Sequence, residues 1–211
     1  METSSQALNA PRLTGVYPIV NAGRDAVPIA RAALRAGVRI VQYRAKDGID
    51  AETLRALRAV TREHDALLIL DDDWRAALAC DCDGVHLGPD DDGYADLAPV
   101  RAAVGTRVIG VSCGTPEEAR GAQAMGADYV GVGAVYATRS KADAGTPLGV
   151  EGLRRVCATT TLPVAAIGGI DASNIDAVRA TGVAMAAVIS AISDAPDPYE
   201  ATAALVRAWK R

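Results

Sequence analysis

The chain has 211 residues, half of them hydrophobic, and carries a net charge of -4 with a pI near 5.2. That length suits one domain with a full core, and the acidic balance argues against a nucleic-acid binder, which usually presents a basic patch. No apolar run reaches membrane length, and Met1 to Pro11 lacks the apolar segment of a secretory signal, so we expect a cytoplasmic protein.

Short apolar segments alternate with amphipathic ones along the chain. The expected strands are 14–20, 39–43, 66–70, 84–87, 107–111, 129–132, 164–167 and 184–189. The expected helices are 26–36, 51–63, 74–80, 94–104, 116–125, 150–158, 173–180 and 199–209.

Strict alternation of strands and helices implies parallel strands joined by right-handed crossovers. Eight such units in about 200 residues predict an α/β fold, a (β/α)8 TIM barrel in a single domain. We place the barrel at 13–211 and expect 1–12 to be disordered. The alternative is a doubly wound sheet, but that fold usually has fewer units and a glycine-rich turn after its first strand, which 20–23 does not supply.

A weak repeat supports equivalent units. Gly37, Gly126 and Gly182 each stand where a predicted helix ends and a strand begins, a position that glycine occupies in the left-handed conformation without penalty. The corresponding residue before the fourth strand is Asp81, which we expect to tolerate that conformation less well.

The cysteines give no sign of a metal or disulfide framework. Cys80 and Cys82 form a C-x-C pair without a His or Cys partner at zinc-finger spacing, and Cys113 and Cys157 are isolated. We expect four small apolar residues in a reducing compartment.

Two neighbouring strands end in acid clusters, at 71–73 and 90–92. Either cluster alone is more often a solvated loop or a helix cap, and Asp73 is well placed to cap the helix at 74–80. Two clusters at equivalent positions bring like charges to the same edge of the sheet, where a divalent cation would relieve their repulsion. The sequence therefore predicts a magnesium site.

Other strand ends carry anion-binding residue types. Strand alternation sends Gln42, Arg44 and Lys46 to one face, although basic residues on a strand are more often a surface feature. The turn at 168–169 is Gly-Gly, which is commonly only a tight turn, but beside Ser190 it stands where barrels often hold a phosphate. The remaining cations, with Lys141, suggest a second and more highly charged anion, such as diphosphate.

The motifs together resemble the thiamine phosphate synthase family. They are Q-x-R-x-K at 42–46, an acidic pair at 71–72, G-V-H-x-G-x-x-D at 84–91, T-x-[TS]-K at 138–141 and G-G-I at 168–170. Their order and spacing match over about residues 15–192. Asp71 stands where the family usually has Asn, which adds a negative charge beside an anion site.

The resemblance implies a magnesium-dependent transferase that joins 4-amino-2-methyl-5-(hydroxymethyl)pyrimidine diphosphate to 4-methyl-5-(2-phosphoethyl)thiazole, giving thiamine phosphate and diphosphate. It implies that Asp72 and Asp91 hold magnesium. The implied contacts of the pyrimidine diphosphate are Gln42, Tyr43, Arg44, Ala45, Lys46, Asp71, Ser112 and Lys141. The implied contacts of the thiazole phosphate are Thr138, Arg139, Ser140, Gly169, Ile189 and Ser190.

This chemistry requires no enzyme nucleophile or general base. The aminopyrimidine can stabilise a methylene cation as diphosphate leaves, and the thiazole nitrogen can attack it directly. Catalysis then depends on neutralising the leaving group and positioning two substrates, which we assign to Arg44, Lys46, Lys141 and Ser112. His86 is expected to be a packed or hydrogen-bonded strand residue.

Two alternatives remain at this point. A thiazole tautomerase-like paralogue would bind the thiazole phosphate but lack a diphosphate site, and a non-catalytic barrel would bind phosphate ligands without turnover. Retention of Lys46, Asp72, Asp91 and Lys141 disfavours the first. We expect small-molecule partners and no membrane or nucleic acid, and the sequence does not determine the oligomeric state.

Overall fold

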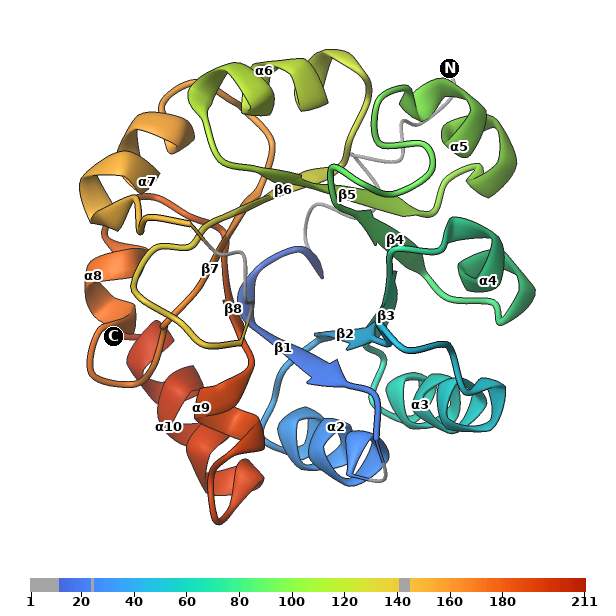
Figure 1. The fold of residues 1–211 in the computed structure, drawn as a ribbon. Helices are drawn as coiled ribbons and strands as arrows, with labels where there is room; N and C mark the ends of the chain where they lie inside the picture. The colour runs from blue at the N-terminus through green and yellow to red at the C-terminus, as the bar shows by residue number, and fades with distance from the viewer. Residues whose placement is uncertain (1–11, 24, 141–144) are drawn as a thin grey trace.

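A computed structural model describes residues 12–23, 25–140 and 145–211, and in these ranges the chain forms a closed barrel of eight parallel strands in sequence order (Figure 1). The predicted TIM barrel is confirmed. The strands are β1 (Gly15–Asn21), β2 (Ile40–Arg44), β3 (Leu67–Asp71), β4 (Gly84–Leu87), β5 (Val108–Cys113), β6 (Tyr129–Val132), β7 (Val164–Ile167) and β8 (Met185–Val188). Residues 1–11 of the segment predicted to be disordered lie outside the described ranges, as does Lys141.

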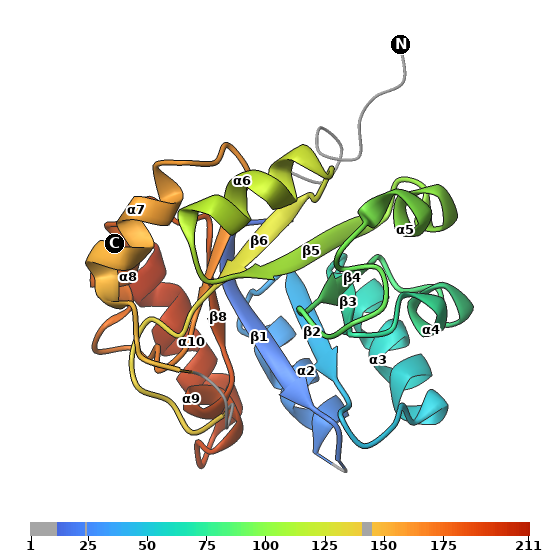
Figure 2. The same ribbon diagram turned by 45° about the horizontal axis from the view of Figure 1, so that its top comes forward.

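Helices surround the strands in the views of Figures 1 and 2. They are α2 (Ala26–Arg35), α3 (Ala51–Glu63), α4 (Trp74–Ala79), α5 (Leu97–Val104), α6 (Pro116–Ala124), α7 (Gly149–Cys157), α8 (Ile175–Arg179), α9 (Ser190–Ser193) and α10 (Pro198–Trp209). The predicted order is correct except that α9 was not expected. Within the described ranges, no helix has the length and apolar character needed to cross a membrane.

Capping side chains explain where several helices begin. Asp73 accepts a hydrogen bond from the Ala76 amide and so caps α4, as predicted. The helix predicted from residue 94 begins only at Leu97 because Asp96 caps it by accepting from the Ala98 amide. Such local hydrogen bonds decide helix ends that apolar periodicity leaves open.

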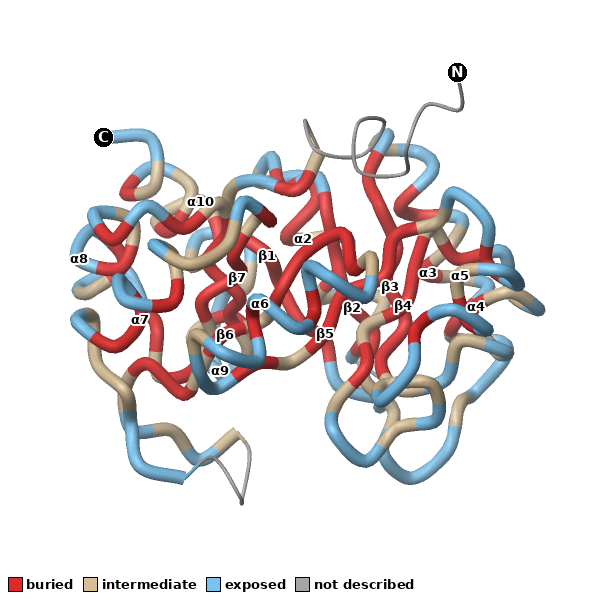
Figure 3. Tube along the Cα trace, turned by 90° about the horizontal axis from the view of Figure 1, so that it is seen from above, coloured by how far each residue is buried: buried red, intermediate tan, exposed pale blue. Residues whose placement is uncertain are grey.

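Alternation along each strand separates two cores. Tyr17, Ile19, Ile69 and Met185 are among the residues that pack inside the barrel, whereas neighbours such as Val16 pack between the strands and the helices. Figure 3 shows the buried strands at the centre and exposed segments around them. The barrel interior is therefore filled by side chains and is not an open pore.

Of the four joints in the predicted repeat, three have glycine at positive φ, at Gly37, Gly126 and Gly182, as predicted. Asp81, which we expected to tolerate this conformation less well, adopts it too, with a φ of 53°. Its carboxylate pairs with the guanidinium groups of Arg62 and Arg107. The left-handed conformation is more accessible to Asp than to most other residues, and these two ion pairs hold its side chain in place.

Gly84 offers a test of how tightly the strands pack. A Cβ at this position would lie 2.4 Å from the Val108 carbonyl oxygen and 2.7 Å from the Val108 Cβ. We predict that Gly84→Ala lowers the free energy of unfolding by about 1–3 kcal/mol, because backbone atoms must move. Urea denaturation measures it.

Gly121→Ala is the matched control. Gly121 lies inside α6, and a Cβ added there would meet no described residue outside its own helix turn within 4 Å. This control should be neutral, or stabilising by up to about 1 kcal/mol, because alanine favours the helix. Equal effects of the two substitutions would contradict the packing argument.

Candidate active site

The carboxyl ends of the strands surround a cavity of about 400 Å³. Most of the residues predicted for the site line it together, although they come from separate strands and loops. These residues are Gln42, Arg44, Lys46, Asp71, Asp72, Asp91, Ser112, Thr138, Ser140, Gly169, Ile189 and Ser190. The predicted convergence on a single rim is therefore confirmed, while the role of each residue stays a prediction.

Three predicted residues do not line this cavity. Tyr43 is fully buried in the core between strands and helices, and Ala45 packs against the same core, because both alternate with the inward-facing Gln42 and Arg44. Arg139 is exposed in the loop after β6. A contact between Tyr43 or Ala45 and a substrate would have to use the backbone.

The acids after β3 and β4 lie close to one another. Lys46 Nζ lies 2.7 Å from Asp72 Oδ2, and Asp91 Oδ2 accepts a 2.6 Å hydrogen bond from the Gly88 amide. Burial and the nearby Asp72 charge raise the pKa of Asp91, although the Gly88 bond acts against them. Asp72 has a φ of 71° and donates its amide N–H to the His86 carbonyl, so the turn that carries it is fixed to β4.

Asp71, the residue that departs from the family pattern, is 8% exposed. Gln42 Nε2 donates to its Oδ1 over 2.7 Å, and Arg44 Nε lies 3.4 Å from its Oδ2. Burial, followed by the charge of Asp72, raises the pKa of Asp71 to about 7, despite the nearby cations. Near neutral pH it therefore bears only part of a negative charge, which reduces its repulsion of an anion in the cavity.

The donor set suits a magnesium ion shared with a ligand. Asp72 and Asp91 supply hard carboxylate oxygens near one another, and magnesium typically takes one or two carboxylates and completes its shell with substrate phosphates and water. Among the described residues, no group of three or more His, Cys, Asp or Glu side chains is arranged to hold a metal alone. The residues fit a cation that binds together with a phosphorylated substrate.

The part of the cavity at the ends of β7 and β8 includes a glycine turn. Gly168 and Gly169 have φ values of 104° and 64°, and a Cβ on Gly169 would lie 2.6 Å from the Ala137 carbonyl oxygen. Only glycine fits this turn, which lines the same cavity as Ser190. The Ser140 amide donates to the Thr138 hydroxyl and orders the start of the neighbouring loop.

Two tyrosines that line the cavity were not predicted from the sequence. Tyr17 and Tyr129 are fully buried, and their hydroxyl oxygens lie 3.0 Å apart. Tyr17 also donates a hydrogen bond to Gln42 Oε1. Tyr129 is hydrogen-bonded to His86, which is hydrogen-bonded in turn to Ser112. The available signal was alternation, which turns Tyr17 to the same inward face as Ile19.

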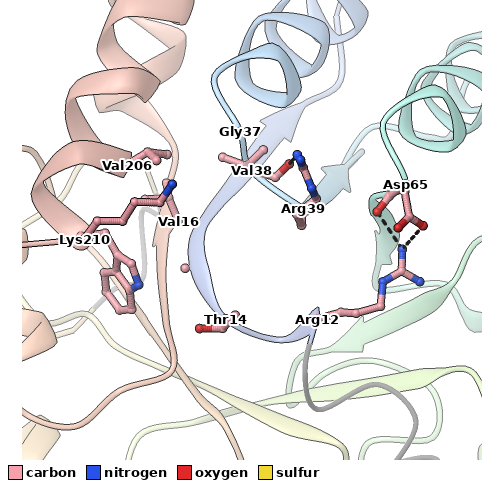
Figure 4. Close-up of a pocket in the computed structure, with 11 residues that line it drawn as sticks. Arg12, Thr14, Val16, Gly37, Val38, Arg39, Asp65, Val206 and Lys210 are labelled. Carbon is pink, nitrogen blue, oxygen red and sulfur yellow. Dashed lines mark hydrogen bonds and ion pairs between the residues drawn. The ribbon is translucent and has the colours of Figure 1, made fainter.

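A second cavity, of about 460 Å³, lies at the amino-terminal end of the strands (Figure 4). Arg12 and Asp65 form a 3.1 Å ion pair in its wall, and the end of α10 contributes Val206 and Lys210. It is slightly larger than the cavity at the carboxyl ends, but it lacks the paired acids and the glycine turn found there. Volume alone therefore does not locate the chemistry.

Cys113 lines the carboxyl-end cavity, so its reactivity bears on mechanism. Burial and the Glu118 charge raise the pKa of its thiol to about 12, which keeps it protonated at neutral pH. We predict that Cys113→Ala retains turnover within about twofold and that iodoacetamide leaves this thiol unlabelled near pH 7.5. Mass spectrometry of the alkylated protein measures the labelling, and loss of activity in proportion to labelling of Cys113 would contradict the prediction.

Comparison with known proteins adds independent information. The family model described as thiamine monophosphate synthase matches residues 16–192. A thiamine-phosphate synthase of Archaeoglobus fulgidus is 45% identical over 194 residues, covering 90% of this chain and 89% of that protein. One of Geobacillus kaustophilus is 43% identical over 195 residues, covering 89% of this chain and 87% of the other. The thiamine phosphate pyrophosphorylase structure from Pyrococcus furiosus superposes with a TM-score of 0.87 at 37% identity, covering 96% of this chain and 98% of its own.

Proposed function

This chain belongs to the thiamine monophosphate synthase family and is a transferase that forms thiamine phosphate, and we propose that it does so at the rim described above. The substrates are the pyrimidine diphosphate and the thiazole phosphate named by the resemblance. The observation that carries the proposal is the convergence of two acids, two cations and a glycine turn on one cavity, at the ends of different strands.

The acid-lined side of the cavity suits the pyrimidine diphosphate. Magnesium, when bound, would be held by Asp72 and Asp91 and would neutralise charge on the leaving diphosphate. Lys46 pairs with Asp72 and Arg44 pairs with the adjacent Asp71, so both positive charges lie near any phosphate that shares the cation. Because charge accumulates on diphosphate as the carbon–oxygen bond breaks, these cations stabilise the transition state more than the bound substrate. Lys141 is proposed to add a third positive charge beside the diphosphate.

The glycine-lined side suits the thiazole phosphate. Gly169, Ile189 and Ser190 line this part of the cavity, together with Thr138 and Ser140 of the loop after β6. Arg139 is exposed next to them and is proposed to reach the phosphate from that loop. Binding at both sides holds the thiazole nitrogen near the pyrimidine methylene carbon, which converts a bimolecular attack into an effectively intramolecular one.

The four cysteines are all free, and Cys80 and Cys82 form no disulfide. Free thiols are typical of proteins from reducing compartments. We propose a cytoplasmic location, as the sequence suggested.

Mixing both substrates with magnesium tests the function directly. We expect thiamine phosphate and diphosphate to form in equal amounts, with no product when either substrate or magnesium is omitted, because the two carboxylates need a cation and the reaction needs both partners. Chromatography of the products with a coupled diphosphate assay measures both. Rearrangement of the thiazole without coupling would instead identify a tautomerase-like protein, and binding without turnover would identify a phosphate-ligand sensor.

The metal assignment makes a sharper prediction. We expect Asp72→Ala and Asp91→Ala each to lower kcat/KM by about 100-fold or more, because each removes a carboxylate from the proposed cation site. The fold should persist, since strand-end residues serve the site more than the core. Kinetics across a magnesium titration, with circular dichroism for the fold, measure both effects.

Asp92→Ala is the matched control. Asp92 belongs to the same acid cluster, but it is exposed and pairs with Arg75 on the surface. Exposed ion pairs contribute little to stability, and this carboxylate does not line the cavity, so activity should stay within about twofold. Full activity in Asp72→Ala or Asp91→Ala would exclude that residue as a magnesium ligand.

A further inference from the structure

Six polar side chains form a continuous hydrogen-bonded chain across the mouth of the barrel. They come from the six consecutive strands β1 to β6, and in order of contact they are Asp71, Gln42, Tyr17, Tyr129, His86 and Ser112. Hydroxyl and amide groups carry fixed numbers of protons, and a neutral imidazole carries one, so the direction of each hydrogen bond can be determined from one end of this series.

The direction is set at the amide of Gln42. Its Nε2 donates to Asp71, which leaves its Oε1 to face Tyr17. An amide oxygen has no proton, so the Tyr17 hydroxyl donates to it over 2.8 Å. That donation uses the single proton of Tyr17. The 3.0 Å contact between the two phenols is therefore a donation from Tyr129 to Tyr17.

The protons of His86 and Ser112 can be assigned in the same way. Tyr129 has used its proton, so the 2.9 Å contact with His86 requires a proton on Nδ1. A neutral imidazole has one such proton, which leaves Nε2 as an acceptor, and the Ser112 hydroxyl donates to it over 3.0 Å. Burial raises the pKa of both phenols above the ordinary tyrosine value, so each keeps the proton that this arrangement requires.

We propose that Tyr17 and Tyr129 are positioning residues that act through His86 to present Ser112 Oγ to the cavity as a hydrogen-bond acceptor, and that this oxygen accepts from the 4-amino group of the pyrimidine. The inference rests on the proposed function for the identity of the substrate. Ser112 lines the cavity, and with its proton directed at His86 only lone pairs remain available to a ligand. Such an oxygen attracts an N–H group and disfavours a phosphate oxygen.

This acceptor strengthens as the reaction proceeds. When diphosphate leaves, the amino nitrogen releases electron density into the ring to stabilise the methylene cation, and its N–H groups become stronger donors. The hydrogen bond to Ser112 therefore gains strength in the transition state relative to the bound substrate. Loss of the acceptor should lower kcat more than it raises KM.

The proton order is testable without substrate. The chain has two histidines, His64 and His86, so nitrogen-15 NMR at about pH 8, where an ordinary imidazole is neutral, resolves the tautomer of each, and His64→Gln assigns the signals. We expect Nδ1–H for His86 in the wild type and Nε2–H in Tyr129→Phe, which removes the acceptor of the Nδ1 proton. The same tautomer in both proteins would overturn the proposal.

Tyr17→Phe provides a second and independent variant. This substitution does not alter a direct contact of His86, but it removes the acceptor of the Tyr129 hydroxyl proton. Tyr129 should then donate to His86 Nδ1, so that the imidazole proton again lies on Nε2. Tyr94→Phe is the control. The Tyr94 hydroxyl donates to the Ser112 carbonyl and to none of the six hydrogen-bonded side chains, so the tautomer of His86 should not change. An unchanged tautomer in Tyr17→Phe would overturn the relay.

Kinetics test the link to catalysis. Tyr129→Phe should lower kcat about tenfold with a smaller change in KM. In a protein that already carries Ser112→Ala, and so lacks the acceptor, Tyr129→Phe should cause little further loss of kcat. Fully additive effects of these two substitutions would overturn action through Ser112. Failure of the proposed function is distinguishable, because a wild type without coupling activity would leave the NMR result unaffected.

Discussion

Repulsion between the carboxylates of Asp72 and Asp91 is the interaction on which the rest of the rim depends. Closing eight parallel strands into a barrel forces the ends of β3 and β4 together, and each end carries an acid. Lys46 offsets part of this repulsion, and the hydrogen bond from Gly88 holds one carboxylate in place. The apolar core elsewhere in the barrel offsets the free-energy cost of holding them close, and the proposed cation would relieve the repulsion.

The barrel interior changes character along its axis. Residues such as Ile40, Leu67 and Met185 form apolar packing within the barrel, whereas tyrosine, glutamine and histidine side chains form a hydrogen-bonded layer at the mouth. Buried polar groups are costly unless they are paired, and those of the chain from Gln42 to Ser112 are paired with one another. This layer is the rigid floor against which a substrate can be oriented.

Much of the fold was predictable because its signals are local. Each signal involves only a few neighbouring residues: apolar segments of the right length, caps such as Asp73, and glycines where helices meet strands. The order and spacing of the strand-end motifs predicted where the site lies. Tyr17 and Tyr129 were missed because they are 112 residues apart and meet only when the barrel closes. The ion pairs at Asp81 could not be predicted from neighbouring residues, because its two arginine partners come from other elements.

The filled interior also limits the route by which substrates enter and products leave. In the described part of the chain, Leu13 and the residues packed with it occupy the barrel below the rim, so reactants and products share the carboxyl-end opening. Under the proposed assignment, a diphosphate that stays beside the acids after the bond breaks would occupy the place that the next pyrimidine diphosphate needs. Each catalytic cycle would then end only when this by-product leaves through the opening by which the substrates entered.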